Sequence, residues 1–171
     1  MIKQPWRPLA NLLGSANAGR YRAFQQGLRE TGNVEGRNVA VEIQPGGDNL
    51  PTFAANLVRR PASVIFATPT AGALAAKRAT STIPIVFLIG GDPVGFGLVG
   101  SLNRPGGNAT GVSFLVNNLV AKQLKLLGRL VPGSAPLGLL IDPSNPNVAA
   151  DTKSAQAKAL RRNGRQITEV I

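Results

Sequence analysis

The chain of 171 residues contains no cysteine and no histidine. Without cysteine there is no disulfide framework, thiolate nucleophile or zinc-finger spacing, and without histidine the commonest general base and metal ligand are missing. The 8 Asp and Glu residues are also too sparse for catalysis by paired carboxylates. The composition therefore argues against an enzyme, and we expect neither a metal nor a cofactor.

Long apolar runs are also absent. The longest uninterrupted one, Ile85–Ile89, is far below the roughly 18 residues that a membrane-spanning helix needs. Near the start, Leu9–Leu13 is broken by Asn11 and is shorter than the roughly 7–15 apolar residues of an export signal. We therefore expect no targeting signal and no membrane span in this chain.

Acidic residues are few beside the 19 Lys and Arg, so the formal net charge is +11. A basic chain can bind nucleic acid, but the doublets Arg59-Arg60, Lys77-Arg78 and Arg161-Arg162 all fall late in predicted helices. Cations there complement the negative end of the helix dipole. Because aromatic residues for base stacking make up only 5% of the chain, we expect no nucleic-acid partner.

Along the chain, short apolar or alternating segments typical of strands take turns with segments whose apolar residues recur at helical spacing. The pattern predicts strands at Leu9–Leu13, Asn38–Gln44, Val64–Ala67, Ile83–Ile89, Ala109–Ser113, Leu137–Ile141 and Gln166–Ile171. It predicts helices at Arg20–Thr31, Leu50–Arg60, Ala71–Thr80, Val120–Val131 and Asn145–Asn163. This alternation is typical of an α/β fold with a parallel sheet between two helical layers. Ile83–Ile89 and Leu137–Ile141 are apolar enough to be buried strands.

Ligands of such sheets bind outside the carboxyl ends of the strands. Thr68, Thr70, Asp92 and Asn145 follow predicted strands there, next to the starts of helices that favour a carboxylate group. Each also has a purely structural interpretation, since Thr and Asn cap helices and Asp-Pro forms turns. Their convergence at one edge favours capture of a small polar molecule.

One nucleotide-binding pattern is present in form only. Gly95, Gly97 and Gly100 match G-x-G-x-x-G, but the fingerprint requires a tight turn from a strand into a helix. Five residues separate Ile89 from Gly95, and Pro105 obstructs a following helix. We therefore interpret this segment as a loop.

Several strings of the sequence resemble a known family. They are FQQGLRETGNVEGRNVAVE, LPTFAANLVRR, IPIVFLIGGDPVGFGLVGSLNRPGGNATGVS, KLLGRLVP and DPSNPN. Together they resemble the substrate-binding proteins of ABC transporters, in the tryptophan/tyrosine-type branch. The resemblance covers nearly all of residues 9–171.

The resemblance implies a type I periplasmic-binding-protein-like fold, in which two lobes close on one ligand. Residues 9–112 would form a complete first lobe and residues 113–171 a partial, C-terminally truncated second lobe that exposes apolar surface. The implied function is the solute-binding component of an ABC importer, a non-catalytic periplasmic receptor that delivers a small ligand such as an amino acid to permease subunits in the membrane. The implied ligand-binding residues are Ser15, Thr68, Thr70, Asp92, Asn145 and Asn147.

Two alternatives remain open at this point. The same fold serves as the ligand-sensing domain of transcription regulators, although no helix-turn-helix precedes residue 9. The chain could also be a non-functional truncated remnant.

Overall fold

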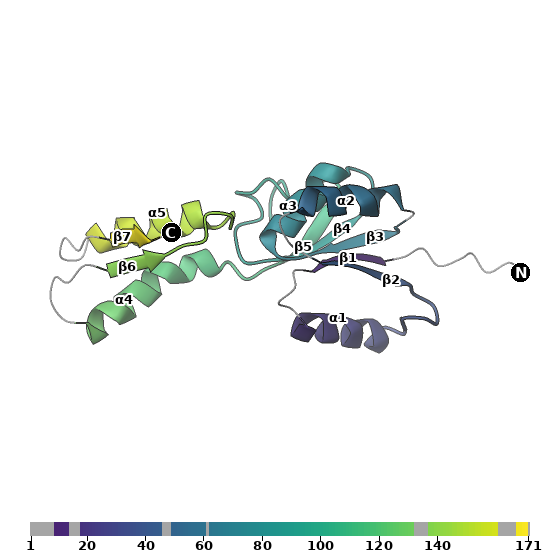
Figure 1. Cartoon of the computed structure of the whole chain (residues 1–171), viewed down its shortest axis with the longest axis horizontal. Helices are drawn as coiled ribbons and strands as arrows, with labels where there is room; N and C mark the ends of the chain where they lie inside the picture. The colour runs from purple at the N-terminus through teal and green to yellow at the C-terminus, as the bar shows by residue number, and fades with distance from the viewer. Residues whose placement is uncertain are drawn as a thin grey trace, which may run out of the picture. The chain divides into compact units, whose positions relative to one another are not determined.

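The computed structural model describes residues 9–13, 18–45, 49–60, 62–131, 137–160 and 167–170. Strands and helices alternate along them, as the hydrophobic pattern predicts (Figure 1). The elements are β1 (Leu9–Leu13), α1 (Ala18–Glu30), β2 (Val41–Pro45), α2 (Leu50–Arg59), β3 (Val64–Ala67), α3 (Thr70–Ala79), β4 (Ile85–Ile89), β5 (Ala109–Ser113), the 3-10 helix η1 (Val116–Leu119), α4 (Val120–Leu130), β6 (Leu137–Leu140), α5 (Val148–Leu160) and β7 (Ile167–Val170).

Two predicted strands begin later than expected. β2 begins at Val41 because Asn38 closes a turn: its Oδ1 accepts the Val34 N–H at 2.6 Å and its Nδ2 donates to the Gly32 carbonyl at 2.9 Å. β4 begins at Ile85, after Pro84, which has no N–H to give to a sheet ladder. The helix expected from Asn145 begins at Val148, and its expected end at Asn163 lies outside the described residues.

The chain forms two compact units, and the boundary between them lies close to β5. The first comprises the residues up to Ile89 together with Pro93–Ser113, and the second comprises Gly90–Asp92 and the residues from Phe114 onward. The lobe limits of 9–112 and 113–171 stay a prediction.

The first unit contains a five-stranded sheet in the order β2-β1-β3-β4-β5, and every neighbouring pair is parallel. Helix α1 covers one face of this sheet, and α2 and α3 cover the other (Figure 1). The predicted three-layer α/β architecture with a parallel sheet is confirmed.

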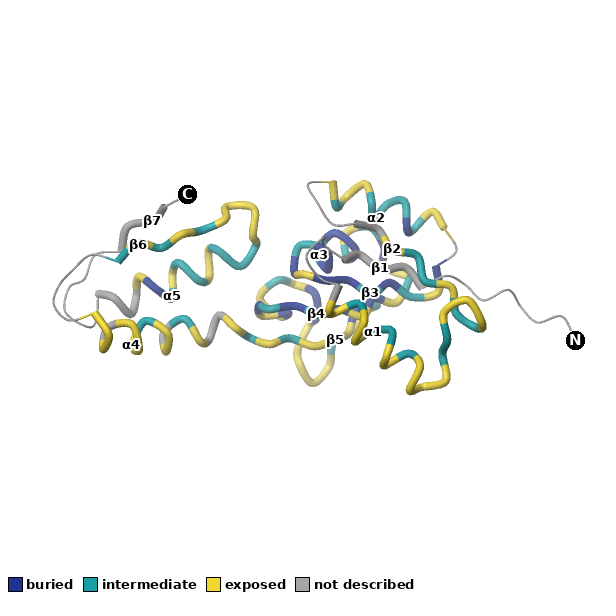
Figure 2. Tube along the Cα trace, turned by 60° about the horizontal axis from the view of Figure 1, so that its bottom comes forward, coloured by how far each residue is buried: buried dark blue, intermediate teal, exposed yellow. Residues whose placement is uncertain are grey.

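The core of the first unit lies between the sheet and the α2–α3 layer (Figure 2). Leu57, Ile65, Ile85 and Ile89 are fully or almost fully buried there. On the other face, the rings of Phe24 in α1 and Phe66 in β3 stack with centroids 4.7 Å apart. The apolar packing explains why these strands are the most apolar stretches of the sequence.

Burial of β4 is less complete than expected for a strand covered on both faces. Its side chains alternate in exposure, and Val86 remains 38% exposed. α1 is the helix on that face, and it faces β3 through the Phe24–Phe66 contact. The prediction of full coverage was therefore wrong for this face of β4.

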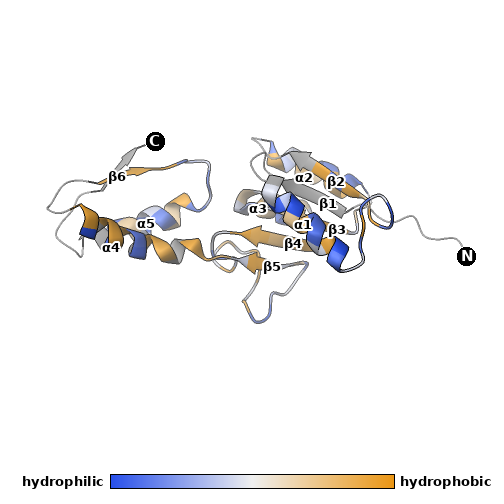
Figure 3. Cartoon of the chain, turned by 90° about the horizontal axis from the view of Figure 1, so that it is seen from below, coloured by the Kyte–Doolittle hydropathy of each residue, from blue (hydrophilic) through white to orange (hydrophobic). Residues whose placement is uncertain are grey.

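The second unit consists of the parallel pair β6-β7 with α4, α5 and η1. Its described residues include one buried apolar side chain, Ala155, whereas Leu126, Leu130 and Leu140 are 51%, 79% and 80% exposed. The expected burial of Leu137–Ile141 was wrong, because a two-stranded sheet offers few neighbours to cover it. The expected exposure of apolar surface in this half is confirmed. Much of this surface lies on α4, a helix that also contains basic residues (Figure 3).

Candidate functional site

The strand order of the first unit fixes where a ligand site is expected. The chain passes from β1 outward to β2 and then returns across β1 to β3, so the direction of winding reverses between β1 and β3. Ligands of doubly wound sheets bind outside the carboxyl ends of the strands at such a reversal. The loop after β3, Thr68–Thr70, lies at this point. Ser15, in the loop after β1, lies outside the described residues.

Thr68 is the first residue after β3, and its side chain is completely buried. No described residue hydrogen-bonds its Oγ1 atom. Burying a hydroxyl without a partner costs about 1–3 kcal/mol by mutational measurements, so native proteins rarely leave one without a reason. A bound polar ligand would give this hydroxyl its partner.

Helix α3 starts beside that hydroxyl, with Thr70 as its first residue and only 2% exposed. Pro69 occupies the cap position, and no side chain caps the helix. The structural interpretation of Thr68 and Thr70 as capping residues was therefore wrong. The amides of the first helical turn and the positive end of the helix dipole favour an anionic group, such as a carboxylate, at this place.

Asp92 follows β4 and belongs to the second unit, where it is exposed. The glycine-rich segment after it contains turns and no helix. Its Leu98 is 1% exposed, belongs to the core and donates its N–H to the Pro93 carbonyl at 2.9 Å. The segment is a packed loop, without the helix start that a dinucleotide fingerprint requires.

Asn145 and Asn147 lie together before α5 in the second unit. Asn145 Oδ1 accepts both the Asn147 N–H and Asn147 Nδ2, each at 3.0 Å. That oxygen is engaged in a local turn, so a ligand contact by Asn145 would use its Nδ2 donor. In the same loop the hydroxyl and N–H of Ser144 lower the pKa of Asp142 by bonding its carboxylate.

Two polar groups of α5 are inconspicuous in the sequence. Asp151 Oδ1 and Thr152 Oγ1 are buried with no hydrogen-bond partner among the described residues, and burial raises the pKa of Asp151. Polar residues are common in the first turn of a helix. What distinguishes these two is their burial, which the residue types alone do not reveal.

A second cluster was also missed. Tyr21 and Gln25 stand four residues apart on α1 and both donate to Glu35, in the turn after the helix. In the sequence, their i, i+4 spacing and an acidic residue shortly after the Gly32-Asn33 turn could have indicated this cluster.

The described residues contain no group of three or more acidic, cysteine or histidine side chains that could hold a metal ion. Among the same residues, no helix has the length and apolarity needed to cross a bilayer.

The first unit thus has the doubly wound parallel sheet of small-molecule-binding α/β proteins. At the point where such proteins bind ligands it has a buried hydroxyl without a partner among the described residues. Residues 12–170 match the family model described as ABC transporter substrate binding protein. Because that match covers most of the chain, the protein belongs to this family.

Individual relatives agree with this assignment. A tyrosine-binding protein of Clostridioides difficile (strain R20291) is 32% identical over 145 residues, which are 83% of this chain. The crystal structure of a conserved domain protein from Vibrio cholerae is 26% identical, covers 96% of this chain and superposes with a TM-score of 0.80. An ABC domain from Streptococcus pneumonia in complex with L-Trp, 24% identical over 96% of this chain, also has a TM-score of 0.80 and shares the fold.

These relatives are longer than the sequence described here. The chain covers 41% of the tyrosine-binding protein and 57% of each of the two solved chains.

Proposed function

We propose that the protein is the solute-binding component of an ABC importer and captures a small polar ligand such as an amino acid, without catalysing a reaction. The observation that carries this proposal is the Thr68 hydroxyl, which is fully buried, unpaired among the described residues and located at the winding reversal of the sheet. Family membership and the tyrosine-binding relative support the ligand class.

Within the first unit, Thr68 would hydrogen-bond the carboxylate of the amino acid, and the start of α3 would stabilise its negative charge. The hydroxyl is suited to this role because it is already removed from water in the folded chain. A hydrogen bond to a charged acceptor would offset the free-energy cost of that desolvation. Thr70, the first residue of α3, would line the same place.

Asp92 is the proposed partner of the ligand's ammonium group, since an exposed carboxylate can pair with a cation. Asn145 and Asn147 are proposed further contacts, and Ser15 is proposed from its position after β1. The proposed cellular setting is the periplasmic or extracellular side of the membrane, with permease subunits as partners.

Isothermal titration with L-tyrosine, L-tryptophan and L-leucine tests the proposal. We expect one of them to bind the chain, and the double variant Thr68→Ala/Asp92→Ala to lose that binding. The double variant Ser63→Ala/Asn103→Ala, at two exposed positions, is the matched control. No binding to the parent chain would contradict the function, whereas unchanged affinity in the Thr68/Asp92 variant would contradict only the residue assignment.

A further inference from the structure

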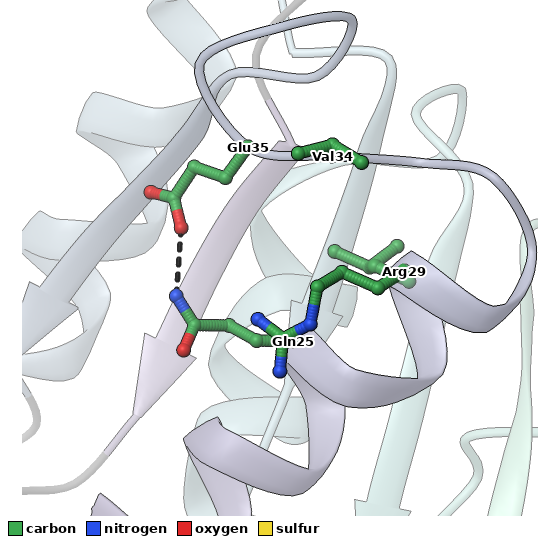
Figure 4. A pocket seen from close by; sticks show the side chains of 5 residues that line it. Gln25, Arg29, Val34 and Glu35 are labelled. Atoms are coloured by element: carbon green, nitrogen blue, oxygen red, sulfur yellow. Dashed lines mark hydrogen bonds between the residues drawn. The ribbon is translucent and has the colours of Figure 1, made fainter.

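A surface cavity of about 300 Å³ lies in the first unit between α1 and the turn that follows it. It is lined by Gln25, Leu28, Arg29, Val34 and Glu35 (Figure 4). The volume is at the lower end of the range for small-molecule sites. None of these residues belongs to the proposed site around Thr68.

The cavity contains a carboxylate held in a fixed position. Glu35 Oε2 accepts a hydrogen bond from Gln25 Nε2 at 2.8 Å (Figure 4). The same oxygen accepts the Tyr21 hydroxyl at 3.0 Å. Burial and the nearby Glu35 raise the pKa of Tyr21, which keeps the phenol protonated and donating. Both hydrogen bonds use one oxygen, Oε2, and no described residue donates to Glu35 Oε1. That oxygen is therefore available to a cationic donor.

The turn that carries Glu35 is held in place by the chain itself. Asn38 bonds Val34 N and the Gly32 carbonyl, and the Gly36 N–H donates to the Val39 carbonyl at 2.9 Å. Gly36 has φ +77°, a conformation that glycine adopts without strain. The wall of the cavity is thus formed before any ligand arrives, which lowers the entropic cost of binding.

Arg29 supplies an opposite charge to the same cavity. It lies in the last turn of α1 and is exposed, and its side chain makes no hydrogen bond or ion pair with another described residue. A cation there also complements the helix dipole, but that role does not require it to line a cavity. The half-buried apolar side chains of Leu28 and Val34 complete the lining.

We propose that this cavity is a second ligand site, which binds a short aliphatic α-amino acid as a zwitterion. Its ammonium group would donate to Glu35 Oε1, its carboxylate would accept from the Arg29 guanidinium, and its side chain would pack on Leu28 and Val34. Because both charged groups are exposed to water, each contact is weak, and we expect a dissociation constant on the order of 1 mM.

An NMR titration that follows backbone amide shifts tests this proposal, because its readout separates the two sites by residue. L-leucine should shift the amides between Gln25 and Glu35. L-leucine methyl ester lacks the carboxylate and N-acetyl-L-leucine lacks the ammonium, so both should bind at least about fivefold more weakly. No shift in this segment up to about 20 mM L-leucine, or equal binding of all three compounds, would overturn the proposal.

Single substitutions then assign the contacts. Arg29→Gln and Glu35→Gln should each weaken L-leucine binding at this segment about fivefold. Arg22→Gln and Glu30→Gln, on the same helix but outside the lining, should leave it unchanged. If Glu35→Gln disturbs the turn, Arg29→Gln still decides, since the Arg29 side chain is exposed and has no partner among the described residues. Equal affinity in Arg29→Gln and the parent chain would refute the assignment.

Discussion

Replacing Thr68 by valine should make the protein more stable and a poorer ligand binder at the same time. The substitution exchanges a hydroxyl for a methyl group of similar volume at a position with no exposed surface. The hydroxyl has no hydrogen-bond partner among the described residues, so its burial costs about 1–3 kcal/mol. Valine should recover about 1–2 kcal/mol of that cost. For a chain of this size, this raises the melting temperature by about 2–8 °C.

Thr80→Val is the matched control for the stability measurement. Thr80 is also buried, at 8% exposure, but its Oγ1 accepts the N–H groups of Thr82 at 3.2 Å and Ile83 at 3.1 Å. The same substitution there leaves two amides without that acceptor and should destabilise the protein by about 1–3 kcal/mol. Thermal unfolding of the ligand-free proteins should therefore shift in opposite directions for the two variants.

Ligand binding supplies the second readout for Thr68→Val. If the hydroxyl donates to a ligand carboxylate, losing that bond costs about 1.5–3 kcal/mol, or roughly a 10- to 150-fold weaker affinity. A variant that melts below the parent chain would show that the hydroxyl has a protein partner. A variant that is stabilised but binds its amino acid unchanged would show that Thr68 does not contact the ligand.

Three further perturbations test other parts of the structure. Gly111→Ala should destabilise the protein by at least about 1–3 kcal/mol in urea unfolding, because a Cβ there would clash with the Phe87 backbone carbonyl oxygen and lie 2.7 Å from the Phe87 ring. Gly27→Ala, in an open part of α1, should stabilise by up to about 1 kcal/mol. Asn108→Ala should cost about 2–4 kcal/mol, because it removes one bond from Lys77 and two to backbone carbonyls, and Asn103→Ala is its exposed control. The raised pKa of Asp151 means that the folded protein holds this proton more tightly than the unfolded chain, so ionisation disfavours folding as pH rises above about 3.8. Asp151→Asn should therefore stabilise at pH 7 and have no such advantage at pH 3, and a pH-independent difference would contradict this cause.

The order of strands and helices was predictable because it depends on local pattern. Val64–Ala67 and Ala109–Ser113 were predicted with the bounds that the structure has. For Val64–Ala67 the polar residues Ser63 and Thr68 mark both ends of the apolar run. Element ends that depend on side-chain contacts were less accurate. Nothing in the pattern around Asn38 indicates that its amide would bond both Val34 and Gly32 and so delay β2.

Burial was predictable only where the number of covering layers was known. The apolar strings Ile85–Ile89 and Leu137–Leu140 look alike in sequence, yet Ile85 is fully buried and Leu140 is 80% exposed. The difference arises because β4 is an inner strand of five and packs against α3, while among the described residues β6 pairs with β7 alone. Sheet size is a property of the whole fold, and no local window of residues contains it.

For the candidate site, the sequence likewise predicts where Thr68 lies in the fold but not its hydrogen bonding. That Thr68 follows a strand at a ligand-binding edge could be inferred from the sequence, and capping was then its more common explanation. Only the three-dimensional structure shows that Pro69 holds the cap position and that the Thr68 hydroxyl has no partner among the described residues. Together these two facts favour ligand binding over helix capping as the role of Thr68. A buried hydroxyl that neither caps a helix nor bonds its neighbours destabilises the fold unless a ligand forms the missing hydrogen bond.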